Sequence, residues 1–412
     1  MTTSIIVIGA GVVGASTALA LQKDGHQVTL VDRDSPCSGA SFGNAGAIVN
    51  GSCVPTAMPG TIFDVMSMLS QPLSPLSIKA SYFPKILPWL MRFILQSRTR
   101  AVDDNSKHLH ALSKTAVASW QKLTANSEIS CLLRQTGWLK VYESDKSFDG
   151  TKKSRELVDK IGTPYEILNA SQIHDLEPNL APIFKRGFYQ KDSLSIINPD
   201  RLVKGMVELF VAEGGTYKQF EVKTIKTTSD KVEISDHKNS LSADKIVIAT
   251  GAWSRTLAKQ LGDSIPLDTE RGYHLMMPES TKKLLNRPVL NGENSFVLSP
   301  METGLRMTSQ VEFAGLKAKP NYKHIRNLLP AVKRMLPKVD TSEQSVWLGF
   351  RPSIPDSLPV IGFSTRSDRV LYAFGHHHLG MTLGAITGLT IADLVAKRQT
   401  AFSLTPYQAN RF

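Results

Sequence analysis

Cysteine is scarce in this sequence, with Cys37, Cys53 and Cys131 the three present among 412 residues. They show no C-x-x-C spacing, so they indicate neither a zinc site nor a disulfide framework. We therefore expect no bound metal and a reducing, cytoplasmic location.

Long apolar runs are also lacking, because no stretch reaches the ~18 uninterrupted apolar residues expected of a membrane-spanning helix. A short apolar run at residues 5–8 begins close to Met1, has no basic segment before it and ends in glycines. This pattern is typical of a strand rather than of a signal peptide. The expectation is no spanning helix and no cleaved leader.

Negative charge is under-represented, with 36 acidic against 48 basic residues and a net charge of +12. A basic surface can attract nucleic acid, anionic lipid or small anionic substrates. The basic residues are scattered, and no stripe of basic and aromatic residues appears, which disfavours a nucleic-acid partner. An ordinary solvated surface is the favoured interpretation, and association with an anionic membrane face is the alternative.

One segment keeps the membrane alternative open. Residues 82–95 are apolar and aromatic, and Lys85, Arg92, Arg98 and Arg100 lie within or beside them. Such a segment can lie at a lipid interface. It can equally form a buried helix that closes a second domain, which is the interpretation we favour.

The most informative motif lies at the N-terminus. Four β-branched residues run into a Gly-x-Gly-x-x-Gly turn formed by Gly9, Gly11 and Gly14, and a second apolar run ends on Asp32. In such a βαβ unit the glycines allow a tight turn and close approach to a pyrophosphate, and the terminal acid accepts hydrogen bonds from ribose. The helix N-terminus adds unpaired N–H groups and partial positive charge. The motif predicts dinucleotide binding.

A second strand signal lies about two hundred residues later. Lys245 begins a run whose next three residues, 246–248, are apolar and lead into Ala249, Thr250 and Gly251. Small residues at the end of a buried strand let the backbone pass close to a cofactor. Together with the N-terminal motif, this pairing is usual in flavoproteins rather than in nicotinamide dehydrogenases. A chain of this length is expected to fold as two domains.

Further motifs carry a resemblance to a known family. They are the loop from Ser41 to Gly46, Arg271-Gly272-Tyr273, the stretch Gly349-Phe350-Arg351-Pro352, and the glycine- and histidine-rich entry to the last helix at residues 375–382. With the N-terminal motif, they resemble the FAD-dependent D-amino acid oxidase superfamily over nearly the whole chain. Within it, the chain is most similar to bacterial D-amino acid dehydrogenase small subunits and D-hydroxyproline dehydrogenases.

The resemblance implies an α/β fold with a discontinuous Rossmann-like FAD-binding domain and an inserted α+β substrate domain built on an antiparallel sheet. We assign residues 1–80, 198–262 and 347–412 to the FAD-binding domain. Residues 81–197 and 263–346 form the predicted substrate domain.

The resemblance and the motifs together give a set of cofactor-binding residues around FAD. They are Gly9, Gly11, Val12, Val13, Gly14, Asp32, Arg33, Ser41, Asn44, Ala45, Gly46, Val222, Thr250, Gly251, Trp253, Gly349, Gly375, His378, Gly380 and Thr382. The N-terminus of the last helix is expected to face the flavin and to stabilise its anionic reduced form. Some relatives tether FAD to a cysteine, but the matching stretch around residue 350 has none, so we predict non-covalent FAD.

Arg351 carries the substrate prediction. A guanidinium fork binds a carboxylate through two parallel hydrogen bonds and so fixes its orientation. Tyr273 is a second candidate contact, with a buried structural tyrosine as the alternative, and His274 is a weaker one. His376 is a candidate for tuning the flavin or contacting the amine, with a helix-start histidine bonded to backbone as the alternative. Three consecutive histidines rarely converge on one ion, so no metal is predicted at residues 376–378.

The predicted reaction is oxidative deamination of a D-amino acid or proline-like amino acid, by hydride transfer from Cα to flavin N5. Electrons are expected to pass to a quinone or another acceptor, with the protein cytoplasmic or peripheral to the inner membrane. One alternative is an oxygen-using oxidase of glycine, sarcosine or another secondary amine. Another is a flavin-binding scaffold without turnover. The sequence does not fix the oligomeric state.

Overall fold

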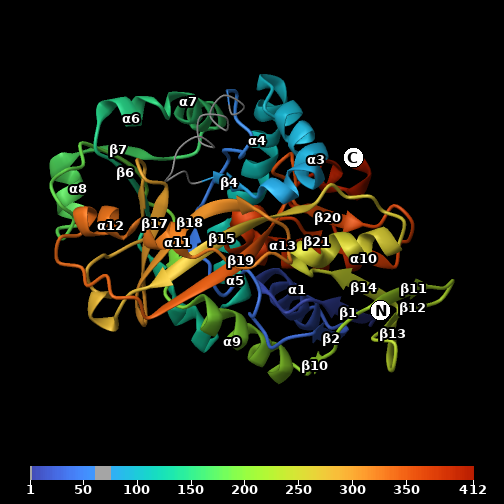
Figure 1. Ribbon diagram of the computed structural model, residues 1–412. Helices are drawn as coiled ribbons and strands as arrows, with labels where there is room; N and C mark the ends of the chain where they lie inside the picture. The colour runs from blue at the N-terminus through green and yellow to red at the C-terminus, as the bar shows by residue number, and fades with distance from the viewer. Residues whose placement is uncertain (1, 61–75) are drawn as a thin grey trace.

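The computed structural model describes residues 2–60 and 76–412 (Figure 1). A six-stranded sheet takes up the N-terminal motif, and its strand order is β10-β2-β1-β14-β21-β20. The central strands pair in parallel, and β20 is an antiparallel edge strand. The bounds are β1 (Ser4–Ile8), β2 (Gln27–Asp32), β10 (Thr216–Gln219), β14 (Lys245–Ile248), β20 (Val360–Phe363) and β21 (Val370–Phe374).

Helices cover this sheet. Helix α1 (Val12–Lys23) joins β1 to β2 and packs against α13 (Gly380–Val395) and α9 (Pro199–Ala212). Helix α9 begins at Pro199, and the preceding Asn198 side chain accepts a hydrogen bond from the Arg201 N–H. Such a cap satisfies an amide that has no partner within the helix.

The last helix with its preceding turn, His377–Val395, is the described segment long and apolar enough to cross a membrane. About two-thirds (67%) of its apolar window is buried inside the protein. It packs on α1 and on α5 (Ala116–Leu123). These contacts are those of a core helix.

The second sheet is nine-stranded and mixed, in the order β19-β15-β18-β17-β16-β6-β8-β7, with β4 paired to β18. Its pairs are antiparallel except β16–β6 and β18–β4. The bounds are β4 (Leu76–Ile78), β6 (Trp138–Tyr142), β7 (Glu166–Asn169), β8 (Arg186–Gln190), β15 (Asp268–Met276), β16 (Val289–Asn291), β17 (Phe296–Met301), β18 (Gly304–Phe313) and β19 (Ser345–Ser353). The predicted fold class, with two sheets of different type, is confirmed.

Smaller elements complete the fold. A three-stranded sheet joins β3 (Ala47–Ile48), β9 (Leu194–Ile196) and β5 (Leu133–Gln135), and another joins β11 (Thr224–Thr227), β12 (Val232–Ser235) and β13 (Ser240–Ala243). The other α-helices of the described residues are α3 (Phe83–Gln96), α4 (Thr99–Ser113), α6 (Asp145–Asp149), α7 (Lys152–Ile161), α8 (Ala170–Leu176), α10 (Ser254–Gln260), α11 (Lys323–Arg326) and α12 (Leu329–Met335).

Three segments pack with the sheet or core of the other domain than the one to which the sequence assigned them. Strand β4, predicted in the FAD-binding domain, pairs with the nine-stranded sheet. Helices α4 and α5, predicted in the substrate domain, place Leu109 and Trp120 in the core around α1 and α13. Strand β19 starts before residue 347 and is wholly part of the nine-stranded sheet. Apolar periodicity shows that a helix has a buried face, but not which sheet covers it.

Helix α3 has features of both interpretations of residues 82–95, a buried helix and a segment at a lipid interface. Ile86 and Trp89 are buried, and the Trp89 ring packs against Phe313 at a centroid distance of 5.3 Å. The opposite face is open to solvent, with Met91 61% exposed. The helix is therefore buried on one side and apolar on both.

Candidate functional site

The two sheets enclose one large cavity of about 1010 Å³. Its wall takes in the glycine-rich turn, the loop 38–45, the end of β14, and the inner faces of β15, β18 and β19. This volume is at the upper end for small-molecule sites and suits a dinucleotide better than a small metabolite alone.

At one end, the glycine-rich turn is packed so tightly that side chains are excluded. Gly9 has φ +108°, and an added Cβ would lie 2.5 Å from the Ala249 carbonyl oxygen. A Cβ on Gly14 would lie 1.7 Å from the Gly9 carbonyl oxygen. The turn therefore needs these glycines, and it directs the N-terminus of α1 at the cavity.

The acid at the end of β2 supports the same turn. Asp32 accepts hydrogen bonds from the N–H of Ala10 at 2.6 Å and from the N–H of Asp34 at 3.0 Å. Burial raises the pKa of Asp32. Beside it, the Arg33 guanidinium stacks over the Trp253 ring at 4.2 Å. These side chains form a polar and aromatic end suited to ribose and adenine.

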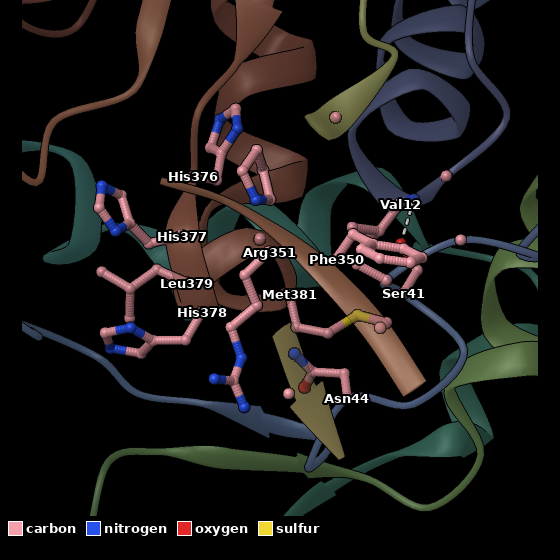
Figure 2. A pocket seen from close by; sticks show the side chains of 18 of the residues that line it. Val12, Ser41, Asn44, Phe350, Arg351, His376, His377, His378, Leu379 and Met381 are labelled. Carbon is pink, nitrogen blue, oxygen red and sulfur yellow. Dashed lines mark hydrogen bonds between the residues drawn. The ribbon is translucent and has the colours of Figure 1, made fainter. Parts of the chain in front are cut away.

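The loop 41–47 crosses the middle of the cavity wall. Ser41 Oγ accepts a hydrogen bond from the Val12 N–H at 2.9 Å, which ties the loop to the start of α1 (Figure 2). Asn44 Oδ1 accepts from the Gly46 N–H at 2.8 Å. Arg306 on β18 donates to the carbonyl oxygens of Phe42 and Asn44, both at 2.8 Å. Sequence reasoning missed Arg306, whose pKa burial lowers to about 10.

Arg351 lies at the other end of the cavity. Its side chain leaves β19 and crosses β15 above Gly272, where an added Cβ would lie 2.3 Å from Nη2. Its Nη1 donates to the Gln310 carbonyl oxygen at 2.7 Å. Gln310 has φ +75° and lies in the β-bulge between β15 and β18, which directs its carbonyl at the guanidinium. The remaining donors of Arg351 face the cavity.

Two further ionisable residues of this end were missed. Glu270 lies directly opposite Arg351 in the β15–β19 register and is 5% exposed. Lys140 reaches the wall from β6. Glu270 directly precedes the Arg271-Gly272-Tyr273 motif, and Lys140 lies outside any motif. The register of the folded sheet brings Glu270 to Arg351, and the place of β6 brings Lys140 to the cavity.

The three histidines point in different directions (Figure 2). His376 Nε2 lies 2.9 Å from Thr387 Oγ1. His377 Nε2 accepts a hydrogen bond from the Ile354 N–H at 2.8 Å, and its Nδ1 lies 3.8 Å from Glu270. His378 is exposed and lines the cavity.

Burial lowers the pKa of all three imidazoles, to about 3 for His376 and about 4 for His377 and His378. The three are therefore neutral at pH 7. In the described part of the chain, no group of three or more His, Cys, Asp or Glu side chains is placed to hold a metal ion. His376 contacts the Thr387 side chain and not the backbone, and it also lines the cavity, so its role stays a prediction.

Tyr273 also differs from its predicted role. Its hydroxyl donates to Glu312 at 2.5 Å and accepts from the Asn321 N–H at 3.2 Å. Its ring packs in the core of the nine-stranded sheet, away from Arg351. Tyr273 borders the cavity together with Gly272, but its ring and hydroxyl are engaged on the other face of the strand. This geometry favours the structural alternative. His274 stacks on Trp347 at 5.3 Å, and burial lowers its pKa to about 3.

Most predicted cofactor residues come together on the wall. Those lining it are Gly9, Gly11, Val12, Val13, Asp32, Arg33, Ser41, Asn44, Ala45, Val222, Thr250, Gly251, Trp253, Gly349, His378, Gly380 and Thr382. Gly14, Gly46 and Gly375 lie behind the wall and act through packing. A Cβ on Gly375, for example, would lie 2.3 Å from Ile354 Cδ1.

Comparison with known proteins agrees with this geometry. The family model described as FAD dependent oxidoreductase matches residues 4–394. The chain belongs to this family. It is 34% identical to the D-amino-acid oxidase of Bradyrhizobium diazoefficiens, over 99% of this chain and 98% of that relative. It is 28% identical to the D-amino acid dehydrogenase of Vibrio vulnificus, over 96% of each chain.

Solved structures share the fold. Glycine oxidase from Geobacillus kaustophilus has a TM-score of 0.74 at 23% identity and covers 100% of both chains. L-proline dehydrogenase from P. horikoshii has a TM-score of 0.75 at 18% identity, over 100% of this chain and 98% of the other. At these identities the likeness concerns architecture.

As in its family, the cofactor of this oxidoreductase is FAD. The observed residues fit it. The Gly9–Gly14 turn leaves space for a pyrophosphate at the α1 N-terminus, and Asp32 lies at the ribose end. The first turn of α13, including Gly380 and Thr382, lines the opposite part of the wall. Its N–H groups supply partial positive charge there.

Proposed function

We propose that this flavoprotein oxidises the α-carbon of a D-amino acid, with Arg351 holding the substrate carboxylate. The observation that carries the proposal is the Arg351 guanidinium, which lies over Gly272 with its unused donors toward the cavity. Relatives named D-amino-acid oxidase and D-amino acid dehydrogenase that align over almost the whole chain support it.

The chain's own residues bind and orient the substrate. Arg351 fixes the carboxylate, and the Gln310 carbonyl holds the guanidinium in place. Glu270 lies on the same face and offers a carboxylate to the substrate amino group. His378 remains neutral and adds no charge that would repel that group. Bound FAD supplies the two-electron acceptor, and the oxidised imino product hydrolyses to a 2-oxo acid and ammonia.

Anaerobic reduction of the holoenzyme tests this proposal. Matched D- and L-alanine, D- and L-proline, hydroxy-D-proline, glycine and sarcosine are mixed with the protein, and loss of the visible flavin absorbance is followed. We expect D-amino acids to bleach the flavin and their L-enantiomers to fail. Bleaching by glycine or sarcosine alone would favour the secondary-amine oxidase. No bleaching by any compound would favour a scaffold without turnover.

For the electron acceptor, we propose a membrane quinone reached from the cytoplasmic face. The support is the outward face of α3, where large apolar residues recur every three or four positions and so share one side. They are Phe83, Leu87, Met91, Ile94 and Leu95, each at least 39% exposed. Lys85 and Arg92 flank this face, and α3 contains no acidic residue. Such a helix can lie in an anionic lipid interface.

An oxygen-using oxidase is the second candidate, because the 34% identical relative is named an oxidase. Peroxide formation under air, compared with reduction of a quinone analogue, separates the two. Membrane association is tested by sedimentation with vesicles that contain or lack anionic lipid. We expect binding to anionic vesicles that Leu87→Asp with Met91→Asp abolishes. Ile167→Asp, at an exposed apolar site elsewhere, is the matched control and should still bind.

A further inference from the structure

Lys140 is a second cation on the inner face of the nine-stranded sheet. It lies on β6 opposite Phe188 of β8, and its Nζ is 5.1 Å from the centre of the Phe188 ring. Two residues along each strand, on the same face, the pair Trp138 and Gln190 also lines the cavity. The lysine is therefore part of the wall above the reaction end, although the resemblance assigns it no role.

Among the lysines and arginines of the described wall, Lys140 and Arg351 lack the acidic partner that the others have. The described wall contains four such residues, of which Arg33 pairs with Asp34 at 3.0 Å and Lys223 with Glu221 at 2.5 Å. Lys140 and Arg351 are the other two, and no described carboxylate lies within ion-pair distance of either. Burial lowers the pKa of Lys140. An unpaired buried cation is costly, and an anionic ligand offsets that cost.

The spacing of the two cations suits one small molecule. The Arg351 guanidinium reaches β18 at Gln310, and three strand-to-strand steps separate β18 from β6. At about 4.8 Å per step, this is about 14 Å. In the structure the Lys140 ammonium lies over the Phe188 ring on β8, on the side of β6 away from β18. The lysine stem is about 6 Å long, so an ammonium that turns from Phe188 toward β18 on binding a ligand comes to about 8 Å. Two carboxylates about 5 Å apart, each held at about 3 Å, need about 11 Å, which lies within that range.

Electrostatics place the two cations around the same point. The charges of Arg351 and Lys140 both lower the pKa of His378, and the charge of Glu270 raises it. Since His378 faces the cavity, both cations lie within electrostatic range of the space in front of it. Its neutral ring adds no charge of its own to that space.

We propose that Lys140 and Arg351 form a two-cation substrate site, which selects amino acids whose side chain carries a second carboxylate. Arg351 binds the α-carboxylate, and Lys140 binds the side-chain carboxylate. This inference rests on the proposed function and names its substrate class as acidic D-amino acids. The basic character of the whole chain, +12, also favours the approach of such anions.

Matched acid and amide substrates test the inference in the wild-type holoenzyme. D-glutamate is compared with D-glutamine, and D-aspartate with D-asparagine, by the rate constant for anaerobic flavin reduction divided by the dissociation constant. We expect the acid to be preferred by about 10- to 100-fold, the effect of one charge-assisted hydrogen bond. Equal or better reduction by the amides would overturn the inference.

A binding measurement separates this inference from the proposed function. Glutarate carries two carboxylates and butyrate one, and each is titrated into the oxidised holoenzyme while the flavin spectrum is recorded. Glutarate should bind at least about tenfold more tightly than butyrate. If glutarate is favoured but no amino acid bleaches the flavin, the two-cation site stands and the proposed reaction fails. If neutral D-amino acids bleach it and acids gain nothing, the two-cation site alone fails.

Variants assign the effect to the lysine. Lys140→Met should abolish the acid preference, whereas Lys140→Arg should keep much of it. Lys191→Met, at an exposed lysine beyond β8, is the matched control and should keep the full preference. Persistence of the preference in Lys140→Met would refute the assignment. If Lys140→Met does not retain FAD, the acid preference is measured in Lys140→Gln instead and compared with that of the wild type.

Discussion

Replacement of Arg351 by methionine perturbs the substrate site most directly. One donor of the guanidinium is engaged by the Gln310 carbonyl, and the side chain lies over Gly272 so that the others face the cavity. Two charge-assisted hydrogen bonds to a carboxylate are worth about 1.5–3 kcal/mol each. Their loss, about 3–6 kcal/mol, should lower kcat/KM by about 10²- to 10⁴-fold.

The assay is anaerobic flavin reduction over a range of D-amino acid concentrations. Arg351→Lys keeps a point charge but loses the fork, so we expect about half of the free-energy loss. Arg326→Met is the matched control, because Arg326 is exposed and pairs with Glu343 on the surface. FAD content and thermal stability show whether each variant is folded. If Arg351→Met keeps full FAD and stays within threefold of the wild type, the carboxylate assignment is wrong.

Four other predictions concern the cofactor and stability. Gly14→Ala should yield protein without FAD, because its Cβ would lie 1.7 Å from the Gly9 carbonyl oxygen, and stoichiometric flavin absorbance would contradict this. Arg306→Met should weaken FAD retention during dialysis by releasing the loop at Phe42 and Asn44, whereas unchanged retention would show that the loop holds itself. Acid precipitation should release all FAD into the supernatant, and flavin remaining with the pellet would indicate a covalent bond. The free energy of unfolding should fall as pH drops from about 6.5 toward 4, because His376 and His377 have a lowered pKa when folded and only the unfolded chain takes up protons in this range. Chemical denaturation at a series of pH values should show a slope of up to about 1.4 kcal/mol per pH unit for each histidine, and a flat profile would contradict their burial.

The nucleotide end of the site could be predicted because its signals are local. The contacts among Gly9, Gly14 and Asp32 form within one βαβ unit, so spacing along the chain is enough to place them. The reaction end depends on sheet register instead. Gly272 and Tyr273 are neighbours in sequence, yet their side-chain positions lie on opposite faces of β15. The sequence alone does not show which of the two faces is turned to the cavity.

The missed residues show the same limit. Glu270 meets Arg351 only through the β15–β19 register, and Lys140 reaches the cavity only through the place of β6 in the sheet. The bulge at Gln310, which holds Arg351, has no glycine to mark it. Helix packing was equally hidden, since α4 and α5 have apolar faces that either core could have covered.

The central claim is that Arg351 presents a D-amino acid to FAD within this cavity. Stopped-flow anaerobic mixing of the wild-type holoenzyme with each enantiomer of one amino acid tests it most directly. Saturable flavin reduction by the D-enantiomer, absent with its mirror image and lost in Arg351→Met, is the predicted result. Reduction that is independent of configuration, or that survives intact in the variant, would contradict the account.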